Sequence, residues 1–121
     1  MRNDTDHTLK LTYGKPTRAF VFPCEPKPMI SAIFDDHYEA FPTWREAGLS
    51  GLTCIHVDAH LDVMSDGFSA DSLQAIAKAE TSEELLAFRS NPRLPWGGFH
   101  CGNYLYPALI DGTVETLIWV V

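Results

Sequence analysis

Short apolar runs alternate with polar segments along the chain, and the runs have the length and residue types of β-strands. Most are rich in β-branched or aromatic residues, and proline or glycine closes several of them. The pattern predicts strands at 19–22, 29–34, 52–57 and 116–121, and an edge strand or arm around 9–13.

Between the strands, apolar positions recur at helical spacing. Helices are predicted at 38–47, 69–79, 81–90 and 104–111. Gly48 would end the first helix, and Thr81 with Glu84 has the spacing of a capping box at the start of the third. Strand, helix and strand follow one another over 29–57, and again from 52 to 121. This order predicts βαβ units, in which the strands are parallel.

A chain of 121 residues is long enough for one domain at most. Its 45% hydrophobic and 21% charged residues are typical of a globular protein. We therefore expect a single α/β domain over 1–121, in which 1–17 form an N-terminal arm or edge strand and 18–121 form a βαβ core.

Charge and cysteine content argue against several classes of protein. A net charge of −7 without a basic run argues against a nucleic-acid partner. Cys24, Cys54 and Cys101 lie far apart without a C-x-x-C pair, so neither a disulfide framework nor a zinc–thiolate cluster is predicted. The N-terminus lacks the apolar core of a signal peptide, and no apolar run approaches the length of a membrane span. The prediction is a cytoplasmic protein with no membrane partner.

Asp58, His60 and Asp62 follow the strand at 52–57 as D-x-H-x-D. Alternate residues of an extended segment point to one side, so these side chains would meet in one small volume. Two carboxylates and an imidazole suit a hard or borderline divalent cation. The alternative is a polar loop with a helix N-cap. The strict spacing, at the carboxyl end of a strand where α/β sheets place their sites, favours a metal site.

Three further residues could complete or support this site. His37 follows the strand at 29–34 and could deliver a ligand to the same rim as Asp58; the alternative is an exposed residue at the start of a helix. Glu39 is either a neighbour of the site or an acidic residue in the first helical turn. His56 shares a strand face with Asp58, and we expect it to orient a carboxylate ligand rather than bind the metal.

The segment 93–103 is glycine-rich with aromatic residues on both sides, which suits a loop that approaches a ligand closely. It has no G-x-G-x-x-G or G-K-[ST] pattern, so a phosphate cradle is not favoured. His100 in this loop is a candidate catalytic proton shuttle, and the alternative is a plain loop histidine.

The D-A-H-L-D sequence of Asp58–Asp62 resembles the D-A-H-x-D motif of the arginase and deacetylase superfamily. H-V-D-A-H at His56–His60, and the earlier D-H-Y-E-A at Asp36–Ala40 followed by Trp44, are most similar to the branch that contains peptide arginases. The similarity covers about 29–121. It implies a three-layer α/β/α fold with a mainly parallel sheet, of which this chain would be a truncated, N-terminal part.

The resemblance also implies an activity. Peptide arginases convert arginine within a peptide to ornithine and urea through a metal-activated hydroxide at a two-manganese site; a small guanidinium compound is the alternative substrate, and Zn²⁺ or Fe²⁺ are alternative ions. Asp58 and Asp62 would bridge the ions, and His37 and His60 would each bind one of them. Asn103 matches an asparagine region that contacts substrate, and Glu39 is a second candidate for substrate binding.

Two features depart from the family pattern. Asp35 stands where glycine is frequent, and no D-x-D pair follows Asp71 to complete a two-metal site. The missing ligands would come from residues beyond Val121 or from another subunit. The alternatives are a non-catalytic domain that binds a metal or a cationic peptide, and a zinc deacetylase-like amidohydrolase. The apolar run 117–121 further predicts either a longer protein or a symmetric partner, in a homo-oligomer, that covers this strand.

Overall fold

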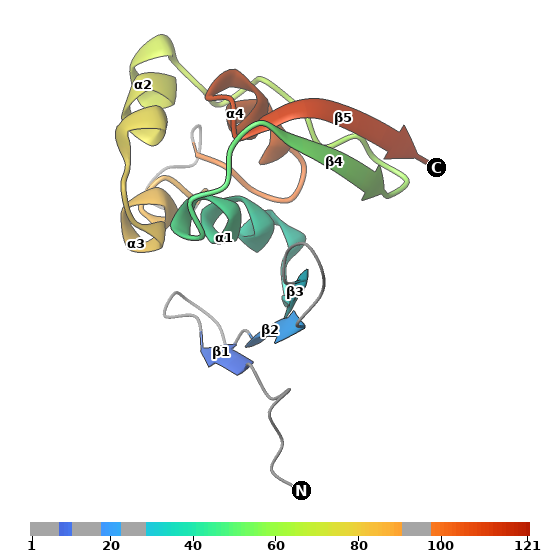
Figure 1. The fold of residues 1–121 in the computed structure, drawn as a ribbon. Coiled ribbons are helices and arrows are strands. Elements are labelled where there is room, and N and C mark those ends of the chain that lie inside the picture. The colour runs from blue at the N-terminus through green and yellow to red at the C-terminus, as the bar shows by residue number, and fades with distance from the viewer. Residues whose placement is uncertain (1–7, 11–17, 23–28, 91–97) are drawn as a thin grey trace, which may run out of the picture. The chain divides into compact units, whose positions relative to one another are not determined.

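The computed structural model describes residues 8–10, 18–22, 29–90 and 98–121. The chain divides into two compact units, Met1–His37 and Tyr38–Val121, and each is described by itself. The division falls inside a single 3-10 turn, η1 (His37–Glu39). The mixture of helices and strands confirms the α/β class (Figure 1). A single domain over 1–121 stays a prediction.

The first unit contains a three-stranded antiparallel sheet in the order β1-β2-β3. Its strands are β1 (Thr8–Lys10), β2 (Arg18–Phe22) and β3 (Met29–Ile33). The predicted strands at 19–22 and 29–34 are therefore confirmed. The predicted parallel pairing of 29–34 with 52–57 is not found among the described strands: β3 pairs with β2 in one sheet and β4 pairs with β5 in another. A connection as short as that from Phe22 to Met29 can join antiparallel strands but not parallel ones.

The second unit contains the parallel pair β4 (Leu52–Val57) and β5 (Val114–Val120). The described part of this unit also contains the helices α1 (Ala40–Glu46), α2 (Ala70–Lys78), α3 (Ser82–Leu86) and α4 (Leu105–Ile110). The second predicted βαβ connection is thus confirmed, from β4 through helices to β5. Parallel pairing among the described strands is confined to this pair. The free ends of both strands reach beyond the helices (Figure 1).

Local capping explains where α2 and α3 begin. The Ser69 hydroxyl accepts from the Ser72 N–H at 3.0 Å, and the Ser72 hydroxyl accepts from the Ser69 N–H at 2.8 Å, which makes a reciprocal capping box for α2. At α3, the Thr81 hydroxyl accepts from the Glu84 N–H at 3.1 Å, as predicted. The Glu84 carboxylate, however, accepts from the N–H of Glu80 at 3.0 Å, so only half of the predicted box forms there.

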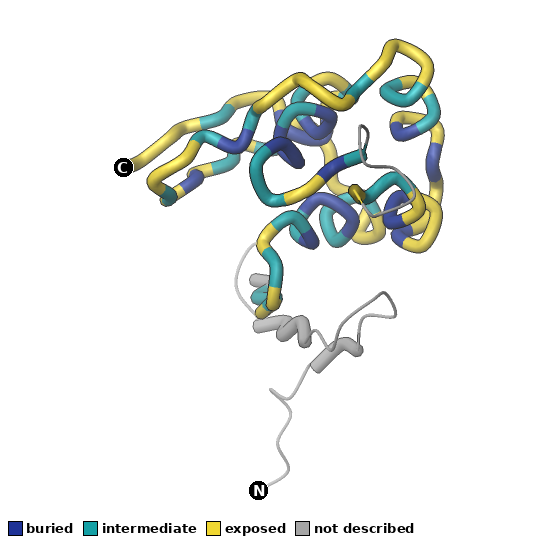
Figure 2. The backbone as a smooth tube through the Cα atoms, turned by 180° about the vertical axis from the view of Figure 1, so that it is seen from behind, coloured by how far each residue is buried: buried dark blue, intermediate teal, exposed yellow. Residues whose placement is uncertain are grey.

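The apolar core of the second unit lies between the helices and one face of the parallel pair. Its buried side chains include Phe41, Ile76, Leu85, Phe99 and Leu105. The ring of Phe99 lies edge-on to that of Phe41, with centroids 5.8 Å apart. In Figure 2 the buried positions gather along the helices, whereas β4 and β5 are largely exposed.

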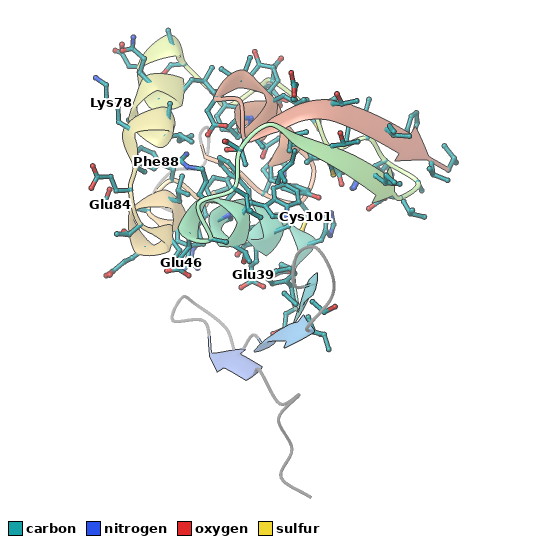
Figure 3. The ribbon with its side chains drawn as sticks, viewed as in Figure 1. Glu39, Glu46, Lys78, Glu84, Phe88 and Cys101 are labelled. Atoms are coloured by element: carbon teal, nitrogen blue, oxygen red, sulfur yellow. The ribbon has the colours of Figure 1, made fainter. Side chains whose placement is uncertain are left out.

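Polar contacts join the helices to each other. The Arg45 guanidinium on α1 donates to the carbonyls of Ile76 at 3.0 Å and of Ala77 and Ala79 at the end of α2, and pairs with Asp111 at 2.9 Å. The carbonyl of Ile76 also accepts from the N–H of Ala79 at 3.2 Å. The arginine thus adds donors at the carboxyl end of α2, where a helix leaves carbonyl groups without helical partners. The side chain of Glu46 accepts from the Ser82 hydroxyl at 2.8 Å, whereas Lys78 and Glu84 point away from the helices (Figure 3).

The outer face of the parallel pair is apolar and exposed. Ile55 and Val57 on β4 lie opposite Ile118 and Val120 on β5, and all four rank among the exposed large hydrophobic residues. No helix within the described ranges combines the length and hydropathy that a membrane span requires.

Candidate metal centre

The D-x-H-x-D motif lies directly after β4, at the carboxyl end of a parallel strand. The chain does not stay extended beyond Val57: Asp58, Ala59 and His60 form a bend, and Asp62 has a positive φ of 61°. Side chains in a bent segment do not alternate as they do in a strand. The i, i+2, i+4 spacing therefore does not bring all three motif side chains into one volume.

Three of the predicted ligands meet in one group. His37, Asp58 and Asp62 each offer a ligand atom, and these atoms lie within 4.8 Å of one another. The group could hold a metal ion. His37 is the first residue of η1, and Tyr38 is the second. Asp62 is buried, Asp58 is half-buried and His37 is exposed, so the group lies at the surface with one carboxylate anchored below it.

His60 lies outside this group. Its side chain is 85% exposed, and its Nδ1 lies 3.6 Å from Oδ1 of Asp58. The backbone N–H of His60 donates to the same Asp58 oxygen at 2.9 Å. The backbone of His60 thus orients Asp58, while its imidazole faces solvent.

His56 lies beneath the carboxylates. Its Nε2 is 2.9 Å from Oδ2 of Asp62 and 3.1 Å from the carbonyl oxygen of His60. Oδ2 of Asp58 is 4.0 Å away. All of these neighbours are acceptors, so Nε2 carries a proton and donates to Asp62. The buried imidazole therefore holds the Asp62 carboxylate in place. It also lies against the backbone carbonyl of His60.

The backbone of the motif is held at both ends by the rest of the unit. The N–H of Asp58 donates to the carbonyl of Val120 at 3.1 Å, and the indole Nε1 of Trp119 donates to the carbonyl of Asp58 at 2.8 Å. At the other end, the N–H of Leu105 donates to the carbonyl of Asp62 at 3.2 Å. The loop is thus fixed by β5 and by the start of α4.

Tyr104 is a neighbour of the site that sequence reasoning missed. Its ring lies edge-on to that of His56, with centroids 6.3 Å apart, and it is buried. Burial raises the pKa of the phenol well above its usual value, and electrostatic interactions with neighbouring acidic groups, among them Cys54 and Asp62, raise it further. The phenol therefore stays neutral and can act only as a hydrogen-bonding group. Its position directly after Gly102-Asn103 was the signal that could have pointed to it.

Trp119 was also missed as a site residue. The sequence placed it in a strand, and the register places it directly opposite His56, on the face that carries the site. An aromatic residue near the end of the strand next to a ligand-bearing strand is the pattern that could have identified it.

Burial also raises the pKa of the Cys54 thiol, which keeps this cysteine protonated. Cys54 lies two residues before His56 on β4, so the two side chains lie on the same face of the strand. Cys101 is half-buried and free. Neither thiol belongs to the metal-ligand group found among the described residues.

The remaining predicted residues do not join the ligand group. Asn103 is buried; its Oδ1 accepts from the N–H of His100 at 2.7 Å and its Nδ2 donates to the carbonyl of Gly98 at 3.2 Å, so its amide braces its own loop. His100 is exposed, and its Nδ1 accepts from the N–H of Gly102 at 3.0 Å. Glu39 is buried at the junction of η1 and α1. Roles for these residues in catalysis or substrate binding stay predictions.

Comparison of the chain with protein-family models, with curated proteins and with solved structures finds no match in any of the three. The site must therefore be interpreted from its own residues.

Proposed function

We propose that this protein is a metal-dependent hydrolase of C–N bonds that acts on a guanidinium group, in the manner of an arginase. One observation carries the proposal: His37, Asp58 and Asp62 present ligand atoms within 4.8 Å of one another at the end of a parallel strand. Ligand sites of α/β sheets lie at that end of the strands. The proposal includes a three-layer α/β/α arrangement of the arginase type around the β4–β5 pair.

The donor set fits a divalent ion. One imidazole and two carboxylates are ligands that Mn²⁺, Fe²⁺ and Zn²⁺ accept, and three protein ligands leave coordination positions open for water and substrate. We propose Mn²⁺ as the ion, with Zn²⁺ or Fe²⁺ as alternatives. When bound, such an ion lowers the pKa of a coordinated water and so supplies a nucleophile at neutral pH. A second ion would need His60 together with ligands that the described residues do not group with it.

The chain's own residues prepare the site for this ion. His56 donates to Asp62, and the N–H of His60 donates to Asp58, so both carboxylates are oriented by hydrogen bonds. Orienting donors of this kind commonly affect metal affinity 10- to 100-fold. A substrate with a guanidinium group, on an arginine-containing peptide or a small molecule, would meet an acidic site on an acidic protein of net charge −7.

Binding of a metal or a cationic peptide without catalysis is a second possible function. The described residues supply one group of three ligands, which is enough to bind one ion but does not complete the two-metal site of the family the motif resembles. The protein would then bind a metal or a cationic peptide without turnover. Self-association that completes the site, and a cytoplasmic location, stay predictions.

The test is urea release. The Mn²⁺-loaded protein is incubated with an N-acetyl-arginine amide, and urea is quantified beside the Asp58→Asn variant as the matched control. Urea from the wild type alone supports the hydrolase. Metal binding without urea supports the binding protein instead, and release of acetate from an acetyl-lysine peptide would favour a deacetylase-like amidohydrolase.

A further inference from the structure

Trp119 lies next to Asp58 of the candidate metal centre. It is 43% exposed although it sits on the same sheet face as the buried His56, its direct neighbour across the β4–β5 pair. Its indole reaches over the end of β4, because Nε1 donates to the Asp58 carbonyl at 2.8 Å. A large aromatic side chain is thus fixed beside a candidate metal ligand without being buried there.

The hydrogen bond determines which part of the ring is free. An indole N–H donates in the plane of the ring, so the bond to Asp58 occupies an edge and leaves the π faces for other contacts. The same bond limits rotation of the side chain, which lowers the entropy lost when a ligand stacks on it.

The neighbours of this ring favour a positively charged ligand. The side chain of Asp58 is 26% exposed and that of His60 is 85% exposed, so solvent reaches both side chains. Trp119 is bound to the backbone carbonyl of the same Asp58. The face of an indole attracts cations, and a carboxylate beside it adds to the attraction. A planar guanidinium can stack on such a face and hydrogen bond through its edge to a carboxylate, which an ammonium cannot do equally well.

We infer that Trp119 is a specificity-determining residue that stacks on the guanidinium of the substrate and holds it beside Asp58. The inference rests on the proposed function, because it names the residue that selects the substrate class of that same site. It assigns a role to the π face of Trp119, separate from the role of its N–H in orienting the Asp58 backbone.

Binding measured without turnover tests this role. N-acetyl-arginine amide and N-acetyl-citrulline amide, which is neutral and nearly isosteric, are titrated calorimetrically into the full chain in the presence of a chelator, so that hydrolysis cannot interfere. The wild type should prefer the arginine compound. Trp119→Leu should weaken its binding about fivefold, equivalent to about 1 kcal/mol, and leave the citrulline compound unchanged.

Two variants separate the π face from other effects. Trp119→Phe keeps an aromatic face but loses the N–H donor, so it should retain most of the preference for arginine. Ile118→Val alters the neighbouring residue on the opposite sheet face and should behave as wild type. Thermal melting of each variant identifies any that is unfolded. Trp119→Ile, which keeps an apolar strand residue but has no π face, replaces a Trp119→Leu variant that does not fold and should show the same loss.

The outcomes distinguish the inference from the proposed function. No preference for arginine in the wild type, or a preference that survives in Trp119→Leu, would overturn the role of Trp119 even if urea is released. A preference that depends on Trp119, in a protein that releases no urea, would support the role of Trp119 and remove the hydrolase.

Discussion

At the scale of single residues, the site depends on hydrogen bonds that orient its carboxylates. The strongest case is His56, whose Nε2 lies 2.9 Å from Asp62 Oδ2 inside the protein. A buried donor to a candidate ligand both satisfies that carboxylate and fixes its rotamer. The consequence should be visible in metal affinity rather than in stability alone.

We expect His56→Ala to weaken Mn²⁺ binding about 10- to 100-fold, because Asp62 loses the donor that orients it. His56→Gln can place an amide N–H near the position of Nε2 and should restore part of the affinity. Isothermal titration with MnCl₂ measures both. His100→Ala serves as the control, since His100 is an exposed loop histidine outside the ligand group. Equal affinities for His56→Ala and wild type would refute the orienting role.

Most of the ligand residues, but not all of them, could be predicted from the sequence. Asp58, Asp62 and His37 were predicted from their places after two strands, and they come together. His60 was predicted as their equal from its spacing, but its side chain is outside the group. The spacing argument assumed an extended chain, whereas Asp62 adopts a positive φ of 61°, which no residue pattern around an aspartate specifies.

At the scale of elements, close backbone contacts fix the loop that precedes α4. Gly98 has a φ of 92°, and a Cβ there would collide with the backbone of Phe88 and Arg89. The N–H of Phe99 donates to the carbonyl of Phe88 at 2.9 Å, so the two segments lie against each other. These contacts fix the start of the loop that continues to Asn103 and Tyr104.

Gly98→Ala should therefore destabilise the protein by about 3 kcal/mol or more, because a disfavoured φ is combined with a collision that only the backbone can relieve. Gly112→Ala is the matched control. Gly112 has a φ of 84° but open space around the Cβ position, so only the conformational cost of about 1–2 kcal/mol is expected. Chemical denaturation compares the two, and equal losses would show that the Phe88 contact does not constrain Gly98.

The elements themselves were largely predictable, and their pairing was not. The strands at 52–57 and 116–121 and the helix caps at Ser69 and Thr81 follow from local residue patterns. Strand pairing is a long-range property that local pattern does not encode. The prediction placed β3 beside β4 because a helix separates them, although a short connection to β2 already favoured an antiparallel pair.

At the scale of the whole molecule, buried titratable groups link stability to pH. Burial and neighbouring negative charges raise the pKa of Tyr104 in the folded protein. The unfolded chain then loses this proton at a lower pH than the folded chain does. The contribution of Tyr104 to the free energy of unfolding is therefore fully present below the pKa of tyrosine in the unfolded chain, about 10, and falls as pH rises above it.

Tyr104→Phe removes this ionisation, so its stability should decline less between pH 9 and about 11 than that of the wild type. Urea unfolding at several pH values measures the slope. Tyr106→Phe is the comparison, since Tyr106 lies in α4, two residues after Tyr104, is half-buried and stacks on Phe68. Parallel slopes for Tyr104→Phe and wild type would contradict the burial of the phenol.

We propose that His37, Asp58 and Asp62 together hold one divalent ion. The most direct measurement is thermal unfolding with increasing MnCl₂, because a ligand that binds only the folded state stabilises it by about 2.7 kcal/mol at a hundred times its Kd. We predict that Mn²⁺ raises the Tm of the wild type and of His60→Ala, and that Asp58→Asn and His37→Ala lose this rise. A rise of equal size in Asp58→Asn, or none in the wild type, would contradict the claim.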